Sequence, residues 1–94
     1  MIELYEKILG RRLQDLEGRE KNIRQIFFRE VLKKIDPREA IVLVLRYDQR
    51  LTYNQIGETI GTTGSRAKQL CVKGTGKLRH PVRRLKLEKI IPVN

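Results

Sequence analysis

Several residue types that define common protein classes are scarce in this chain of 94 residues. It has one cysteine and one histidine, so neither an internal disulfide nor a Cys/His-rich metal site is expected. It has no long apolar run and no signal peptide pattern, so a membrane-spanning segment is not expected. Carboxylates do not cluster in a metal-ligand spacing, and no glycine-rich phosphate loop is present. We therefore expect no catalytic residues, no metal and no cofactor.

Prolines and aromatic residues are also few, with three prolines, five aromatic residues and no tryptophan. The remainder is rich in Leu, Ile, Arg, Lys and Glu, a mixture that is typical of all-α proteins. Hydrophobic residues make up 39% of the chain, which is enough for a modest core. A chain of this length is expected to form one small domain.

The positive charge is concentrated in the last third of the chain. Lys and Arg total 21 against 11 Asp and Glu, which gives a net charge of +10. Residues 66–94 contain nine basic residues and one acidic residue, whereas residues 36–65 are close to neutral. Such a field attracts polyanions. Nucleic acid is the leading partner, and a membrane surface is the weaker alternative. We interpret the protein as cytoplasmic.

The first 35 residues have the apolar spacing of helices. Steps of three and four dominate, which is the helical period, and glycines interrupt the pattern at Gly10 and Gly18. We expect two helices that break near Gly18, because glycine costs roughly 1 kcal/mol relative to alanine inside a helix. The apolar positions are Ile2, Tyr5, Ile8, Leu9, Leu13, Leu16, Ile23, Ile26, Phe27, Val31, Leu32 and Ile35.

These apolar positions form two stripes with different expected roles. The stripe from Ile23 to Leu32 is expected to pack on a helix that includes residues 41–45. The stripe from Tyr5 to Leu16 has less obvious cover in so small a domain. It either packs within the domain, or mediates self-association or binding to a partner protein.

Asp36-Pro37-Arg38-Glu39 reads as the start of a helix. Asp36 can cap free backbone N–H groups, Pro37 fits the first helical position, and Glu39 stands three residues after the cap. Residues 40–45 are almost wholly apolar and rich in β-branched side chains, so a strand is possible there. The cap before them and the Arg46-Tyr47 pair after them favour a buried central helix.

The next two helices predict a helix-turn-helix over roughly Thr52–His80. Thr52 and Gln55 form a capping-box pattern, Gly61-Thr62 ends the first helix, and Thr63 can cap the second. Gly57 would allow the close approach that a helix-turn-helix needs. The expected shared core is Ile56, Ile60, Ala67 and Leu70. The polar side chains left for the major groove are Ser65, Arg66, Lys68 and Gln69.

More than half of the chain, about 36–90, resembles region 4 of bacterial primary sigma factors. The resemblance rests on Asp36-Pro37-Arg38-Glu39, on Leu43–Tyr47, on Thr52–Ile60 and above all on Lys77-Leu78-Arg79-His80-Pro81. It implies a small helical bundle of the winged-helix/HTH type. It also implies reading of the promoter −35 element, and docking on the β-subunit flap of RNA polymerase through an apolar face built largely by the earlier helices.

The resemblance also suggests which residues contact DNA. Thr63 matches the threonine that opens the recognition helix of that family, whereas Gly64 and Ser65 stand where the family usually has Arg and Glu. Ordinary −35 specificity is therefore not assured. The residues that we expect at the DNA are Thr63, Gly64, Ser65, Arg66, Lys68, Gln69, Lys73 and Arg79.

A second departure lies further along the recognition helix. Gly74-Thr75-Gly76 stands where the family usually has Ala-Leu-Arg. Two glycines would cost roughly 2 kcal/mol of helix stability relative to alanine. We therefore expect this helix to kink or to end early near Lys73. Beyond it, Arg79, Arg83, Arg84 and Lys86 are expected to contact phosphates, and His80 is interpreted as a helix-end residue.

We divide the chain into an N-terminal helical segment, 1–35, and a region 4-like domain, 36–94. Sigma region 2 is rich in aromatic residues, and nothing in the N-terminal segment resembles it. The protein is thus a stand-alone region 4, one part of a split sigma factor, or a piece of a longer one. The leading hypothesis is a sequence-specific binder of double-stranded DNA that contacts RNA polymerase. The alternative is a protein-interaction module with little DNA readout, and an enzyme such as a recombinase is the least favoured.

Overall fold

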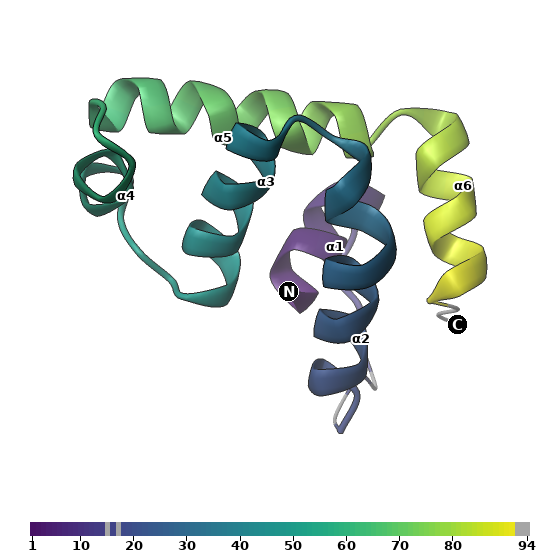
Figure 1. Ribbon diagram of the computed structural model, residues 1–94. Coiled ribbons are helices and arrows are strands. Elements are labelled where there is room, and N and C mark those ends of the chain that lie inside the picture. The colour runs from purple at the N-terminus through teal and green to yellow at the C-terminus, as the bar shows by residue number, and fades with distance from the viewer. Residues whose placement is uncertain (15, 17, 92–94) are drawn as a thin grey trace.

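Every regular element in residues 1–14, 16 and 18–91, the part that the computed structural model describes, is helical (Figure 1). The all-α prediction is confirmed. The long helix α5 runs along the top of the molecule in Figure 1, and the other helices lie below it. In chain order the elements are α1 (Ile2–Leu9), α2 (Glu20–Ile26), η1 (Phe27–Val31), η2 (Leu32–Lys34), α3 (Pro37–Leu43), η3 (Val44–Asp48), α4 (Tyr53–Ile60), α5 (Gly64–Leu78) and α6 (Pro81–Ile90).

The N-terminal segment does contain two helices, but the first ends earlier than expected. Gly10 adopts a left-handed conformation with φ 74° and closes α1, donating its N–H to the Glu6 carbonyl. The Glu6 carboxylate then accepts the N–H of Leu13 at 2.8 Å, which holds the chain in a non-helical path. The break expected near Gly18 therefore occurs at Gly10, and Gly18 forms a turn just before α2.

The apolar side of α1 is covered by the chain itself. Leu4, Tyr5 and Ile8 have no exposed surface. The Tyr5 ring meets Phe27 edge-on at a centroid distance of 6.1 Å, and its hydroxyl donates to the Ile91 carbonyl at 2.6 Å. Burial raises the pKa of Tyr5 to about 12, so the hydroxyl stays a donor over the whole neutral range. For the apolar stripe from Tyr5 to Leu16, the sequence left open either packing within the domain or binding to a partner. The structure shows packing within the domain.

The central helix begins as predicted at α3. Asp36 accepts the N–H of Arg38 at 2.8 Å, and Pro37 is the first helical residue. Residues 40–45 are helical, not a strand, and continue into η3. Val42 and Leu43 share the core with Ile23, Phe27 and Val31, as expected, but Ile41 is half exposed.

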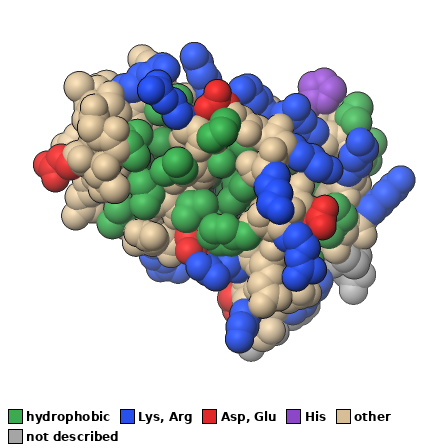
Figure 2. All heavy atoms as spheres, viewed as in Figure 1, with side chains coloured by type: hydrophobic (Ala, Val, Ile, Leu, Met, Phe, Trp, Pro, Cys, Tyr) green, Lys and Arg blue, Asp and Glu red, His purple; other side chains and the backbone are tan. Residues whose placement is uncertain are grey.

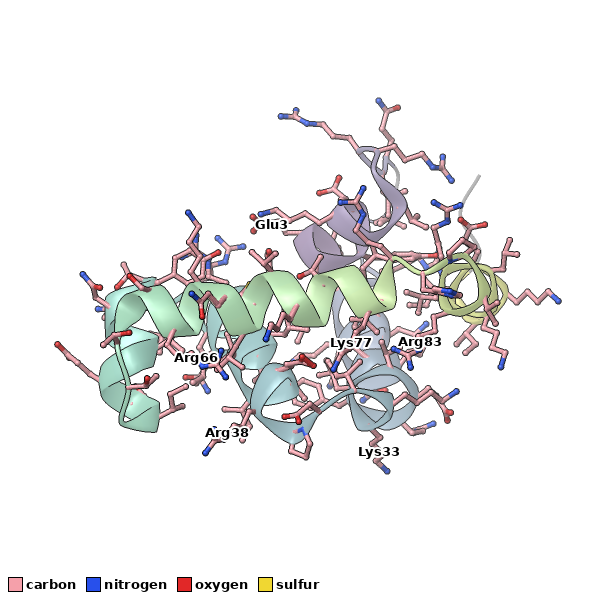
Figure 3. All side chains as sticks on the ribbon, turned by 90° about the horizontal axis from the view of Figure 1, so that it is seen from above. Glu3, Lys33, Arg38, Arg66, Lys77 and Arg83 are labelled. Atoms are coloured by element: carbon pink, nitrogen blue, oxygen red, sulfur yellow. The ribbon has the colours of Figure 1, made fainter. Side chains whose placement is uncertain are left out.

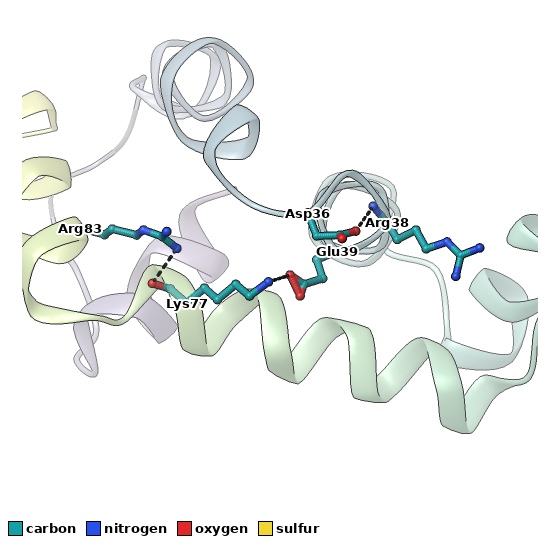
Figure 4. Close-up of polar contacts among 5 residues, drawn as sticks. All are labelled: Asp36, Arg38, Glu39, Lys77 and Arg83. Carbon is teal, nitrogen blue, oxygen red and sulfur yellow. Dashed lines mark hydrogen bonds and ion pairs between the residues drawn. The ribbon is translucent and has the colours of Figure 1, made fainter.

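Glu39 does not complete a capping box as its position suggested. Its side chain is buried, and its carboxylate forms an ion pair with the Lys77 ammonium group of α5 at 2.5 Å (Figure 4). The Lys77 side chain remains half exposed to solvent. The ion pair therefore compensates a buried charge and fixes α5 to the start of α3.

The prediction that α5 kinks or ends near Lys73 is wrong. The helix runs without a break from Gly64 to Leu78. Gly74 is buried where α5 crosses α3, and a Cβ atom there would lie 3.2 Å from both Glu39 Cβ and Leu43 Cδ1. A larger residue would push the two helices apart. Close packing at this crossing offsets the low helix propensity of Gly74.

Candidate nucleic-acid interface

The helix α4, which precedes α5, is held firmly at its start. The Gln55 N–H donates to Thr52 Oγ1 at 3.2 Å, and the Thr52 N–H donates to Gln55 Oε1 at 2.9 Å. This reciprocal pair is the capping box that the sequence predicts. Arg46 adds a second anchor, because its guanidinium donates to the Leu51 carbonyl at 2.9 Å and lies 4.4 Å from the centre of the Tyr53 ring. The capping box and the Arg46 contacts together hold the start of α4 in place.

The turn between α4 and α5 has the two features that a helix-turn-helix needs. Gly61 is left-handed with φ 77°, and its conformation ends α4. At Gly57 a Cβ atom would lie 2.7–2.8 Å from backbone atoms of Thr62 and Thr63, so only glycine fits there. Thr63 then caps α5 by accepting the N–H of Arg66 at 3.1 Å. The predicted roles of Gly57, Gly61 and Thr63 in the fold are confirmed.

One side of α5 faces the core and the opposite side is free of other helices (Figure 1). The buried side consists of Ala67, Leu70, Cys71, Gly74 and Leu78. Of the eight residues expected at the DNA, six are exposed and two, Gly64 and Arg66, are half-buried. Thr63 is the N-cap of α5, and Gly64 to Gln69 form its first turns. Lys73 lies about one turn beyond Gln69, and Arg79 is the C-cap residue just after the end of the helix.

Arg66 and Gln69 interact on this surface. The Arg66 guanidinium donates to Gln69 Oε1 at 3.3 Å, so it orients the Gln69 carboxamide. Figure 3 shows Arg66 on the same side of α5 as Arg38 and Lys77. The sequence predicts both side chains as DNA contacts but does not show that one positions the other.

Basic side chains surround the C-terminal half of α5. In Figure 2 they are spread over α5 and α6, and few acidic side chains interrupt them on this face. Arg83 of α6 reaches back to the Lys77 carbonyl at 3.5 Å (Figure 4). His80 caps α6 by accepting the Val82 N–H at 3.4 Å, which confirms its helix-end role. Such a surface suits an extended polyanion.

A fifty-residue part of the chain, 31–80, matches the family model described as Sigma-70, region 4. The chain belongs to the sigma-70 region 4 family. The match includes η2, α3, η3, α4 and α5, that is, the whole helix-turn-helix and the helix beneath it. The family membership inferred from the Lys77–Pro81 ending is therefore confirmed.

Relatives of this region 4 chain are themselves sigma factors. The RNA polymerase sigma factor SigA of Nostoc sp. is 39% identical over 75 residues, which are 76% of this chain and 19% of that protein. The RNA polymerase sigma factor FliA of Pseudomonas aeruginosa is 38% identical over 50 residues, 53% of this chain and 20% of that protein. The chain spans about a fifth of the length of these relatives. No solved structure gives a significant match.

An open groove borders the C-terminal half of α5 in this region 4 fold. The sequence did not predict it. It has a volume of about 890 Å³ and lies between η1–η2, the end of α5 and α6. Its apolar lining is Val31, Leu78, Val82, Leu87 and Ile90, and its basic lining is Lys34, Lys73, Lys77, Arg83 and Lys86. The spacing of Val82, Lys86 and Ile90 on one side of α6 is the only signal in the sequence that could have revealed it.

Within 1–14, 16 and 18–91, no three His, Cys, Asp or Glu side chains gather as they would around a metal ion. No helix in these ranges has both the length and the apolar character needed to cross a membrane.

Proposed function

We propose that this region 4 chain binds double-stranded DNA sequence-specifically, with α5 in the major groove, and reads a promoter element of the −35 type. One observation carries the proposal. The outer side of α5 presents Ser65, Lys68 and Gln69 to solvent, and α5 is held by the Thr63 cap and the close packing at Gly57. Recognition helices read DNA with side chains at their N-terminal end.

The residues divide by chemistry into readers and anchors. Gln69 can bind adenine through both ends of its carboxamide, and Arg66 orients that group or contacts guanine itself. Lys68, Lys73 and Arg79 are exposed and suited to phosphates. Binding should weaken steeply as salt rises, because phosphate contacts release condensed counterions.

Replacing Gln69 with alanine is expected to weaken binding to the preferred duplex by about 5- to 150-fold, which corresponds to about 1–3 kcal/mol for a bidentate base contact. Binding to random duplex DNA should change little. The preferred sequence comes first from selection out of a random duplex pool, and both affinities are then measured by fluorescence anisotropy. Gln25→Ala, an exposed glutamine of α2, is the matched control. Equal losses on both duplexes would show that Gln69 does not read sequence.

A second candidate function is docking on RNA polymerase, and the groove beside α6 favours it. Apart from Glu30, the charged residues of its lining are basic, and this mixture of apolar and basic side chains fits an apolar segment flanked by acidic residues. We propose the β-subunit flap as the occupant, because the family resemblance implies flap docking. The groove is lined mostly by α5 and α6, whereas the resemblance implies an apolar face built largely by the earlier helices. A protein that acts on DNA and polymerase would work in the cytoplasm. This function is compatible with DNA binding, because the groove lies beyond the reading end of α5.

Ile90→Asp is expected to weaken capture of purified RNA polymerase by about tenfold or more, since it places a charge in the apolar part of the groove. Leu85→Asp is the matched control, because Leu85 is exposed on the same helix and does not line the groove. The measurement is a pull-down with and without nuclease. Loss of the wild-type complex after nuclease treatment would mean that DNA bridges the two proteins and would contradict direct docking.

A further inference from the structure

The recognition helix begins with a residue that has no side chain. Gly64 is the first residue of α5, at the end from which recognition helices usually contact bases. Ser65 follows with a short side chain, so the first two residues of α5 have no side chain that extends far from the helix. Another part of the chain fills this space.

Asn54, on the first turn of α4, lies against Gly64. A Cβ atom on Gly64 would be 2.1 Å from Asn54 Oδ1, 3.2 Å from Asn54 Cγ and 3.3 Å from Asn54 Cα. The Asn54 carboxamide therefore occupies the volume that the side chain of residue 64 would need. Figure 1 shows the arrangement of the two helices, with α4 directly below the start of α5.

The Asn54 carboxamide is available to a ligand. Its residue is exposed, and no side chain or backbone group in 1–14, 16 and 18–91 hydrogen-bonds it. Its backbone is rigid, because Asn54 lies inside the Thr52–Gln55 capping box and α4 packs on α5 through Gly57. A carboxamide with free donor and acceptor atoms on a rigid backbone is a good reader of a base edge, because only the side-chain torsions lose freedom on binding.

We propose that Asn54 is a specificity-determining residue, which reads an adenine at the start of the recognition helix in place of a side chain at position 64. Its Nδ2 would donate to adenine N7 and its Oδ1 would accept from N6, the pairing that asparagine makes with adenine in the major groove. Gly64 is then part of the reading site, since it makes room for Asn54. The inference rests on the proposed DNA-binding function.

The test starts from the duplex selected with the wild-type protein. In a set of variants of this duplex, each adenine in turn is replaced by 7-deazaadenine, which lacks the N7 acceptor. Wild type should lose about 5- to 150-fold in affinity at the adenine that Asn54 reads. Asn54→Ala should bind the unmodified duplex more weakly by a similar factor and show no further loss at that adenine. Asn22→Ala, an exposed asparagine of α2, is the matched control.

Gly64→Ala gives an independent test, because its new methyl group would displace the Asn54 carboxamide, whose Oδ1 lies at 2.1 Å, while the nearest backbone atom, Asn54 Cα, lies at 3.3 Å. It should fold as well as wild type and yet lose the same adenine sensitivity. Gly76→Ala adds a methyl group with nothing within 4 Å and should keep it. Equal losses for Asn54→Ala on all duplexes, or no loss at all, would overturn the inference. Failure of the wild-type protein to bind any duplex would overturn the proposed function itself.

Discussion

Replacing Ile8 with alanine is expected to destabilise the whole domain by about 2–5 kcal/mol. Ile8 has no exposed surface and belongs to the same core cluster as Phe27, Leu43 and Leu70. The helix that carries it precedes the segment matched by the family model, so a boundary at residue 35 would predict a purely local effect. We propose that residues 1–9 are instead an integral part of the region 4 core.

Thermal unfolding followed by circular dichroism measures this effect. The melting temperature should fall by at least about 8 °C, since a domain of this size loses roughly 4–8 °C per kcal/mol. Ile41→Ala is the matched control, because Ile41 is 50% exposed and loses little buried contact. A melting temperature for Ile8→Ala within 2 °C or so of the control would show that α1 contributes little to the stability of the domain.

Gly57→Val is the second substitution with a large expected effect. Backbone atoms of Thr62 and Thr63 would lie within 2.8 Å of its Cβ atom, and backbone cannot move aside as a flexible side chain can. Overpacking of this kind costs about 1–3 kcal/mol, and a branched side chain belongs at the upper end. The crossing of α4 and α5 should also change, so the preference for the selected duplex should be lost.

Gly76→Ala separates this steric effect from a general effect of replacing helical glycines. Like Gly57, Gly76 lies inside a helix, but a Cβ atom on Gly76 would meet nothing within 4 Å. Alanine at this position should be neutral or should stabilise the domain by about 0.5–1 kcal/mol. Urea denaturation of both variants, together with their duplex affinities, gives the comparison. If Gly57→Val unfolds like Gly76→Ala, the close approach of the two helices is not required.

The helix-turn-helix could be predicted because its determinants are local in the sequence. The capping pair Thr52 and Gln55, the left-handed Gly61 and the cap Thr63 each act within a few residues of their own position. Such signals survive in any tertiary context, since they satisfy the backbone groups that a helix end leaves free. The start of α3 at Asp36-Pro37 could be predicted for the same reason.

What the sequence did not reveal depends on contacts between distant segments. In the sequence Gly74 resembles a helix breaker, and only its packing against α3 shows why glycine is needed there. In the same way Glu39 resembles a capping residue, but its carboxylate pairs with Lys77, which is distant in sequence. The position of Asn54 against Gly64 also needs the angle between two helices. At Gly74, packing overrides helix propensity.

The hydrogen bond from Tyr5 to the Ile91 carbonyl also bears on when the domain can form. It joins residues 86 positions apart, one near each end of the ordered helices. A ribosome delivers Tyr5 first, and Ile91 cannot close the core until residues 1–91 have emerged. Such distant contacts slow folding relative to local ones. The helix-turn-helix should therefore assemble on a nascent chain whose first helix still awaits its final partner.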